Sequence, residues 1–283
     1  MKAIVTRTVM VVVLVPTVFS VILLLPWLHH LAINVICIGV SILGAYETAH
    51  FFSERGLPTN SGIFPVAGGL LPLVTYFEVS GILPSGILIP SLVTAIGVIL
   101  VREVMISKHD EFPKVLPRIA SSITVLVYPG LFLTYLVRFS SLPSAGISLT
   151  VFLLIVFVND ILAYLVGSLL GKGTRGFLAV SPNKSIVGFI GGMTGSVLFA
   201  YLSWLVFPEV FAGKLVVAIA VGLGVGFLTI VGDLIESAMK RSSNLKDSGA
   251  VIPGRGGVLD SIDSILFASP LCFYLLSIAG GGR

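Results

Sequence analysis

Long apolar runs follow one another along almost the whole chain and are separated by short polar connections. Nine of these runs are long enough to cross the hydrocarbon core of a bilayer as a helix, which takes roughly 17–25 residues. They lie at about residues 5–26, 31–52, 63–79, 87–104, 119–138, 147–170, 186–207, 214–239 and 258–278. The pattern predicts an all-α polytopic membrane protein with about nine transmembrane helices.

Composition supports this class. The 283-residue chain is 56% hydrophobic and only 11% charged, whereas a soluble domain carries about 25% charged residues. Cys37 and Cys272 lie far apart in apolar runs, which indicates small buried hydrophobic residues and not a disulfide or a metal pair. Pro26 and Trp27 follow the first apolar run where a signal peptide would have its cleavage site, so we interpret that run as a retained helix.

Lysine and arginine are distributed unequally between the two sides of the membrane. With nine spans, 14 of the 17 basic residues fall on one side, and three, Arg138, Lys214 and Arg283, fall on the other. Because cytoplasmic loops carry the excess of basic residues, we expect the N-terminus and the charged loops to be cytoplasmic and the C-terminus to lie outside. The basic side also suits an anionic lipid surface, and we expect no nucleic-acid partner.

The two halves of the chain use ionisable residues differently. Residues 1–146 are apolar spans joined by short loops, and we interpret the charged loop 101–118 as a solvated connector. Glu47 and Glu78 lie in or beside spans, where we favour a structural role. In residues 147–283 the charged residues lie inside or at the ends of spans, where isolated charge is costly and therefore indicates function. We expect the catalytic site in this second part.

The eighth apolar run carries a polar stripe at its cytoplasmic end. One helix face holds four residues at i, i+3, i+4 and i+7, namely Asp233, Glu236, Ser237 and Lys240. A solvated helix end does not explain an aspartate this deep in the run, so we interpret Asp233 as functional. Asp160 lies in the middle of the sixth run and also needs a partner; its role stays open.

A basic loop rich in glycine, "NLKDSGAVIPGRGG", connects the eighth and ninth runs. Its glycines let backbone amides approach an anion closely, and Lys246 and Arg255 supply positive charge. Asp260 and Asp263 follow the loop, one helical turn apart on one face. Because two carboxylates this close repel each other, and because Mg²⁺ is held by one or two carboxylates with phosphate oxygens, we favour a magnesium site over two acids that only stabilise a helix N-terminus.

The segment from Ser237 to Asp263 resembles the signature of the phosphatidate cytidylyltransferases, which reads S-x-x-K-R-x4-K-D, then P-G-H-G-G, then D-R-x-D. The matching positions are Ser237, Lys240, Arg241, Lys246, Asp247, Pro253, Gly254, Gly256, Gly257, Asp260 and Asp263. Arg255 stands where the family usually has histidine, and Ser261 stands where it usually has arginine. These two departures leave in doubt any mechanism that uses the histidine as a proton carrier.

The resemblance implies a nucleotidyltransferase of phospholipid biosynthesis that transfers CMP from CTP to phosphatidate and releases pyrophosphate. The implied catalytic residues are Asp233, Lys240, Arg241, Lys246 and Asp247. The implied substrate-binding residues are Lys184, Ser237, Arg255, Gly256 and Gly257. The implied Mg²⁺ ligands are Asp233, Asp260 and Asp263, with a second cation left open. We further expect a homodimer in the inner cell membrane, with the active site facing the cytoplasm.

Two other functions fit parts of the sequence. A CTP-dependent polyprenol or lipid kinase would use the same nucleotide and would transfer its γ-phosphoryl group. An ion-coupled transporter could use Asp160 and Asp233 to bind cations or relay protons. The chain shows no strong internal repeat, however, and transport does not predict a dense charged loop of fixed spacing.

Overall fold

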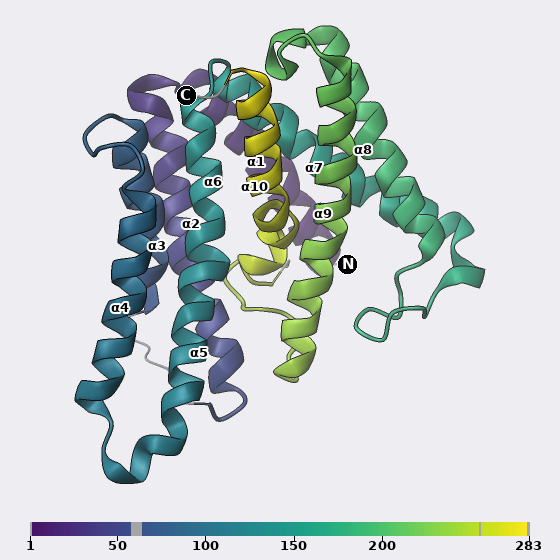
Figure 1. Cartoon of the computed structure of the whole chain (residues 1–283). Helices are drawn as coiled ribbons and strands as arrows, with labels where there is room; N and C mark the ends of the chain where they lie inside the picture. Colours follow the sequence, from purple (N-terminus) through teal and green to yellow (C-terminus); the bar gives the residue numbers. More distant parts are fainter. Residues whose placement is uncertain (1, 58–63, 255, 282–283) are drawn as a thin grey trace. The chain divides into compact units, whose positions relative to one another are not determined.

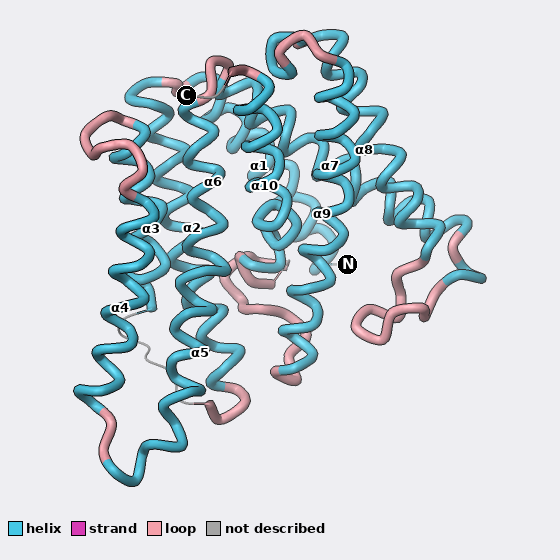
Figure 2. The backbone as a smooth tube through the Cα atoms, viewed as in Figure 1, coloured by secondary structure: helices cyan, strands magenta, loops and turns pink. Residues whose placement is uncertain are grey.

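The chain is helical over almost all of its described length (Figures 1 and 2). The computed structural model describes residues 2–57, 64–254 and 256–281. Within those ranges it contains no strand beyond two isolated bridges, Arg175–Ser185 and Ile252–Gly256. The longer helices are α1 (Lys2–Leu24), α2 (Trp27–Ser53), α3 (Phe64–Val79), α4 (Leu88–Ile106), α5 (Val115–Val125), α6 (Phe132–Arg138), α7 (Ala145–Leu170), α8 (Ile186–Val206), α9 (Leu215–Ser242) and α10 (Leu259–Ala279). Short turns of 3₁₀ or π helix are η1 (His109–Lys114), η2 (Leu126–Leu131), η3 (Phe139–Ser141), η4 (Lys172–Thr174) and η5 (Pro208–Phe211).

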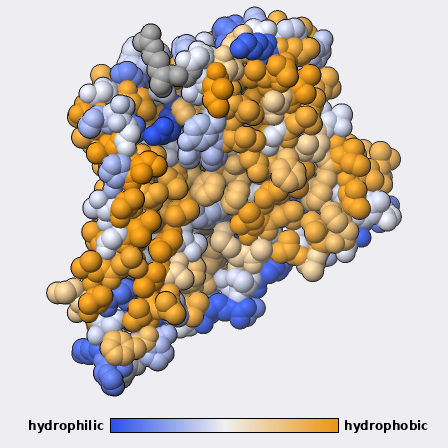
Figure 3. Space-filling model, viewed as in Figure 1, coloured by the Kyte–Doolittle hydropathy of each residue, from blue (hydrophilic) through white to orange (hydrophobic). Residues whose placement is uncertain are grey.

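The predicted polytopic architecture is confirmed. Among the described residues, seven helical segments are long and apolar enough to cross a membrane: Trp27–Ser53, Leu88–Ile106, Glu111–Ser141, Ala145–Leu170, Ile186–Val206, Leu215–Ser242 and Leu259–Ala279. Apolar stretches of α1 at Val12–Leu24 and of α3 at Val66–Val79 match the two remaining predicted runs, so each of the nine predicted runs corresponds to one helical segment. Apolar side chains cover most of the face shown in Figure 3, as helices facing lipid require.

The helices form two compact units, which are described separately. The first unit combines Met1–Ser140 with Met239–Ser261, and the second combines Ser141–Ala238 with Ile262–Arg283. The loop between α9 and α10 therefore belongs to the same unit as the N-terminal helices. The units do not follow chain order, and the predicted division at residue 146 stays a prediction.

Small and polar residues let the helices of the first unit approach closely. The Ser41 hydroxyl of α2 donates to the carbonyl oxygens of Gly68 on α3 (2.6 Å) and Pro129 on η2 (3.2 Å). A methyl group on Gly68 would lie 2.5 Å from the Ala45 side chain. At the end of α3, Glu78 accepts from Arg138 at 3.2 Å and from the Gly86 amide at 2.7 Å. Glu78 therefore joins the turn that contains Gly86 to the end of α6.

Glycines of α8 allow the same close packing in the second unit. A Cβ atom on Gly191 would lie 2.7 Å from Val166, and one on Gly195 would lie 2.4 Å from Leu162, both on α7. Asn159 of α7 is buried and donates to the Ser196 hydroxyl at 2.8 Å and to the Gly226 carbonyl at 3.2 Å. This amide joins α7, α8 and α9, since polar side chains hydrogen-bond between membrane helices.

Candidate active site

In the first unit, an ion pair joins the end of α9 to the beginning of α10. Lys240 Nζ donates to Asp260 Oδ1 at 2.5 Å. The other carboxylate oxygen, Asp260 Oδ2, accepts from the Gly257 amide (2.8 Å), the Ser248 amide (2.9 Å) and the Ser248 hydroxyl (3.0 Å). Asp260 therefore holds both the lysine and two points of the loop between the helices.

The loop closes a tight turn beside this carboxylate. Ile252 and Gly256 exchange two backbone hydrogen bonds of 2.8 and 3.1 Å. Gly256 has a φ of +108°, and a Cβ atom there would lie 2.7 Å from Asp260 Oδ2, so both conformation and space favour glycine. We predicted that Gly256 and Gly257 would let amides approach an anion, and here the amide of Gly257 approaches Asp260. Arg255 lies outside the described residues.

A carboxylate from α2 lies beneath the same loop. Glu47 is 5% exposed. Its Oε1 accepts from the Val258 amide at 2.8 Å, and its Oε2 accepts from the Leu259 amide at 2.8 Å and the Ser248 hydroxyl at 2.9 Å. The sequence did not connect Glu47 with the loop. The available signal was an acid inside an apolar run, which must find polar partners.

In the second unit, Lys184 forms an ion pair with Asp233 of α9. The Ser237 hydroxyl lies 3.5 Å from the other oxygen of Asp233, a long hydrogen bond. Asp233 is 38% exposed at its side chain, so a ligand can reach the carboxylate from solvent. The structure thus brings together three residues that the sequence predicted for the site.

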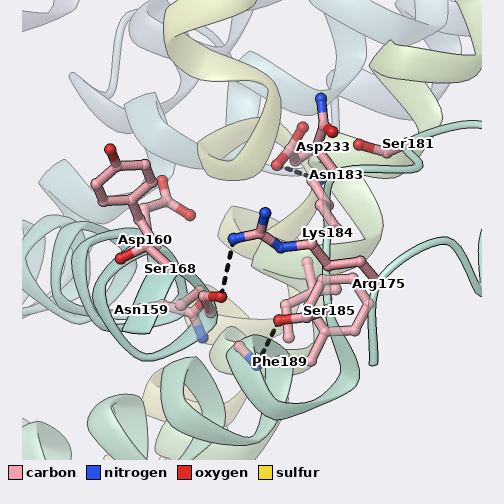
Figure 4. Close-up of a pocket in the computed structure, with 15 residues that line it drawn as sticks. Asn159, Asp160, Ser168, Arg175, Ser181, Asn183, Lys184, Ser185, Phe189 and Asp233 are labelled. Atoms are coloured by element: carbon pink, nitrogen blue, oxygen red, sulfur yellow. Dashed lines mark hydrogen bonds and ion pairs between the residues drawn. The ribbon is translucent and has the colours of Figure 1, made fainter. Parts of the chain in front are cut away.

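Lys184 and Asp233 line a pocket of about 460 Å³ between α7, the loop after it, the start of α8, and α9 (Figure 4). Asp160 and Tyr164 line it from α7, and Arg175 lines it from the loop. Figure 4 shows the Asp160 carboxylate and the Arg175 guanidinium group turned toward the same space. Charges of both signs therefore surround the cavity. The sequence singled out Asp160 without a role and missed Arg175, which looked like one more basic loop residue.

The other predicted residues differ in exposure. Arg241, Lys246 and Asp247 are exposed at the end of α9 and in the loop. Asp263 is 9% exposed, and its Oδ1 accepts from the Ser264 amide at 2.6 Å. Within the described residues, no group of three or more His, Cys, Asp or Glu side chains is arranged to hold a metal ion. A metal held by carboxylates here would need ligands from another source, such as phosphate oxygens.

The sequence of this chain is similar to those of known proteins. The sequence model of the cytidylyltransferase family matches residues 5–279. A Bacillus subtilis protein named phosphatidate cytidylyltransferase is 34% identical over 158 residues, which cover 54% of this chain and 56% of that protein. Proteins of the same name are 40% identical over 126 residues in Synechocystis (43% of this chain, 40% of that protein) and 42% identical over 123 residues in Staphylococcus aureus (44% and 46%).

The aligned part spans about half the length of these curated relatives. The family match, in contrast, covers nearly the whole chain and includes both units and every site residue described above. On that extent of similarity, this chain belongs to the cytidylyltransferase family.

Proposed function

We propose that this protein transfers CMP from CTP to phosphatidate and so forms CDP-diacylglycerol and pyrophosphate. The observation that carries the proposal is the Lys240–Asp260 pair at the glycine-rich loop of a cytidylyltransferase-family chain. The relatives' name and the apolar helices support a lipid substrate. The acyl chains of phosphatidate would stay in the bilayer while its phosphate meets a soluble nucleotide.

The chemistry requires little activation of the attacking group. A phosphate monoester has a second pKa of about 6 and is largely dianionic near neutral pH, so its oxygen needs no strong base. The main barrier is repulsion between two polyanions, and cations that neutralise both substrates lower it. Lys240 and Lys184 are each oriented by an aspartate, and exposed Arg241 and Lys246 add positive charge.

Mg²⁺ is part of the proposal. It would neutralise the triphosphate and stabilise the leaving pyrophosphate. Asp233 fits this role because its carboxylate is accessible, and Asp263 supplies a second acid. Asp260 would first have to give up Lys240, because that lysine donates to Oδ1 while the amides of Ser248 and Gly257 donate to Oδ2. A second cation remains a further part of the proposal.

The membrane setting completes the proposal. The excess of basic residues on one side supports a site that faces the cytoplasm, where CTP is available. We place the protein in the cell membrane and propose a homodimer, for which the glycine-rich spans provide close-packing surfaces.

The deciding experiment follows the label from CTP into lipid. Purified protein in detergent receives phosphatidate, Mg²⁺ and CTP labelled at either the α- or the γ-phosphate. We expect lipid to acquire label from the α position alone, with release of one pyrophosphate per lipid, and we expect EDTA to stop the reaction. Label entering only from the γ position would identify a CTP-dependent lipid kinase. No transfer from either position would overturn the enzymatic proposal and favour a transporter.

A further inference from the structure

Three positions spaced by four residues along α2 and just beyond it contact the segment that carries the family signature. Glu47 contacts Ser248, Val258 and Leu259. The Phe51 carbonyl accepts from the Ser243 hydroxyl at 2.8 Å, and Arg55 Nε donates to the Ser242 carbonyl. Positions four apart share one helix face. One face of α2 therefore supports the end of α9, the beginning of α10 and the signature loop, defined here as residues 243–258.

Glu47 makes the central contact of this face. It accepts the amide hydrogens of Val258 and Leu259 at the first turn of α10, where a helix leaves amides without internal partners. The positive end of the helix dipole also favours a carboxylate there. Because Glu47 is nearly inaccessible to water, no solvent molecule can easily replace these bonds.

The space around Glu47 helps to explain two glycines of the signature loop. A Cβ atom on Gly249 would lie 2.6 Å from Glu47 Oε1, and one on Gly257 would lie 2.5 Å from Glu47 Oε2 and 1.9 Å from the Ser248 hydroxyl that Glu47 contacts. Neither glycine has a φ in the left-handed region, so the backbone itself would accept alanine. The side chain of Glu47 is a physical reason for the small residue at Gly249, and Glu47 together with Ser248 is the reason at Gly257.

A short path of contacts leads from Glu47 to the lysine. The Ser248 hydroxyl lies 2.9 Å from Glu47 Oε2 and 3.0 Å from Asp260 Oδ2. A hydroxyl carries one hydrogen, so Ser248 donates to one of these carboxylates at a time. Asp260 in turn holds Lys240. Movement of Glu47 would thus displace both the loop and the first turn of α10, on which Asp260 lies.

We propose that Glu47 is a positioning residue for the transfer reaction. Its carboxylate fixes the signature loop and the start of α10 so that Asp260 presents Lys240 to the substrate phosphates. This inference rests on the proposed function. It assigns to the N-terminal part of the chain, which carries none of the signature residues, a direct part in shaping the site.

The first test separates positioning from general stability. Glu47→Gln keeps the shape of the side chain but turns an NH₂ group toward hydrogen-bond donors. We expect kcat to fall at least 30-fold, the KM for CTP to stay within threefold, and the unfolding midpoint in detergent to remain within a few degrees. Glu54→Gln, an exposed acid just after the same helix, should leave kcat unchanged. A Glu47→Gln enzyme with kcat within twofold of wild type would overturn the proposal.

A double-variant cycle tests the contact itself. Gly249→Ala should lower kcat at least tenfold in the wild-type background, because the three atoms nearest to its Cβ all belong to Glu47. In a Glu47→Ala background those atoms are gone, so the same change should cost less than twofold further; this non-additivity marks direct coupling. Gly39→Ala on α2, which has open space, should be neutral in both backgrounds. Additive effects of Gly249→Ala and Glu47→Ala on kcat would count against the proposal.

The last readout does not depend on catalysis. Hydrogen exchange of a peptide that contains Val258 and Leu259 should be at least tenfold faster in Glu47→Gln, while a peptide from the middle of α10 should be unchanged. If the wild-type protein transferred no label from CTP but this local exchange rose, the proposed function would be wrong and the positioning contact right. Unchanged exchange in an active protein would overturn the positioning role alone.

Discussion

Two lysine–aspartate pairs, Lys240–Asp260 and Lys184–Asp233, are the main charged features at the scale of single residues. A lysine ammonium group has three donors, so a lysine held by one aspartate keeps donors for phosphate oxygens. An aspartate beside each lysine also balances the charge of that lysine while the substrates are absent. Each pair therefore holds a lysine in position for the substrate phosphates while an aspartate balances its charge.

Asp260→Asn tests the first pair. The change removes the negative charge that holds Lys240 and weakens the acceptor for the loop amides. Hydrogen bonds to charged groups contribute about 1.5–3 kcal/mol each, so we expect kcat to fall at least about 100-fold. The measurement is transfer of α-label from CTP into lipid, with gel filtration to confirm folding. Glu209→Gln, an exposed acid on η5, serves as the matched control. Retention of half the activity by Asp260→Asn would contradict this role.

The sequence analysis named most of the residues that form the two ion pairs, but not which residues pair with each other. Asp233 and Asp260 were predicted because charge in or near an apolar span indicates function, whereas Lys184 and Lys240 were predicted from the resemblance to the family. The pairings were not predicted, since side-chain distances depend on tertiary packing. The contacts of Glu47 were not predicted because its partners lie 201 to 212 residues away, and no spacing rule relates positions so far apart.

At the scale of elements, the signature loop is shaped by its glycines. Gly256→Ala combines a left-handed φ with a Cβ atom 2.7 Å from Asp260, so we expect kcat to fall at least tenfold. Gly81→Ala has a similar φ of +77° in open space and should cost stability without a comparable loss of kcat. Assays of label transfer and thermal unfolding on both variants compare the steric and conformational effects. Equal losses of kcat would show that backbone strain alone matters.

Helix positions were predicted well because span length is set by membrane thickness. The run at 147–170 appears as Ala145–Leu170, and the run at 258–278 appears as Leu259–Ala279. The π turn at Leu126–Leu131 was not predicted. It contains Pro129, which lacks an amide hydrogen, but the residues around it are as apolar as those of any regular span, so hydropathy gives no sign of the local geometry.

At the scale of the whole molecule, the membrane orientation can be tested by labelling. Lys108→Cys should react with a membrane-impermeant maleimide only after cells are opened, and Lys214→Cys should react in intact cells, because we expect these exposed residues on opposite sides. Native Cys37 and Cys272 are buried and add little background. The reverse labelling pattern would place the signature loop outside the cell, where the loop could not reach cytoplasmic CTP.

The contact between Glu47 and α10 also has a consequence for biosynthesis. Leu259 follows Glu47 by 212 residues, so at about 5–20 residues per second the ribosome needs roughly 10–40 s to supply this partner. During that time α2 contains a carboxylate without its final hydrogen bonds, at a cost of about 2.5–3.5 kcal/mol if it enters the centre of the bilayer. We therefore expect α2 to remain near the translocon or an assembly chaperone until the last helix emerges.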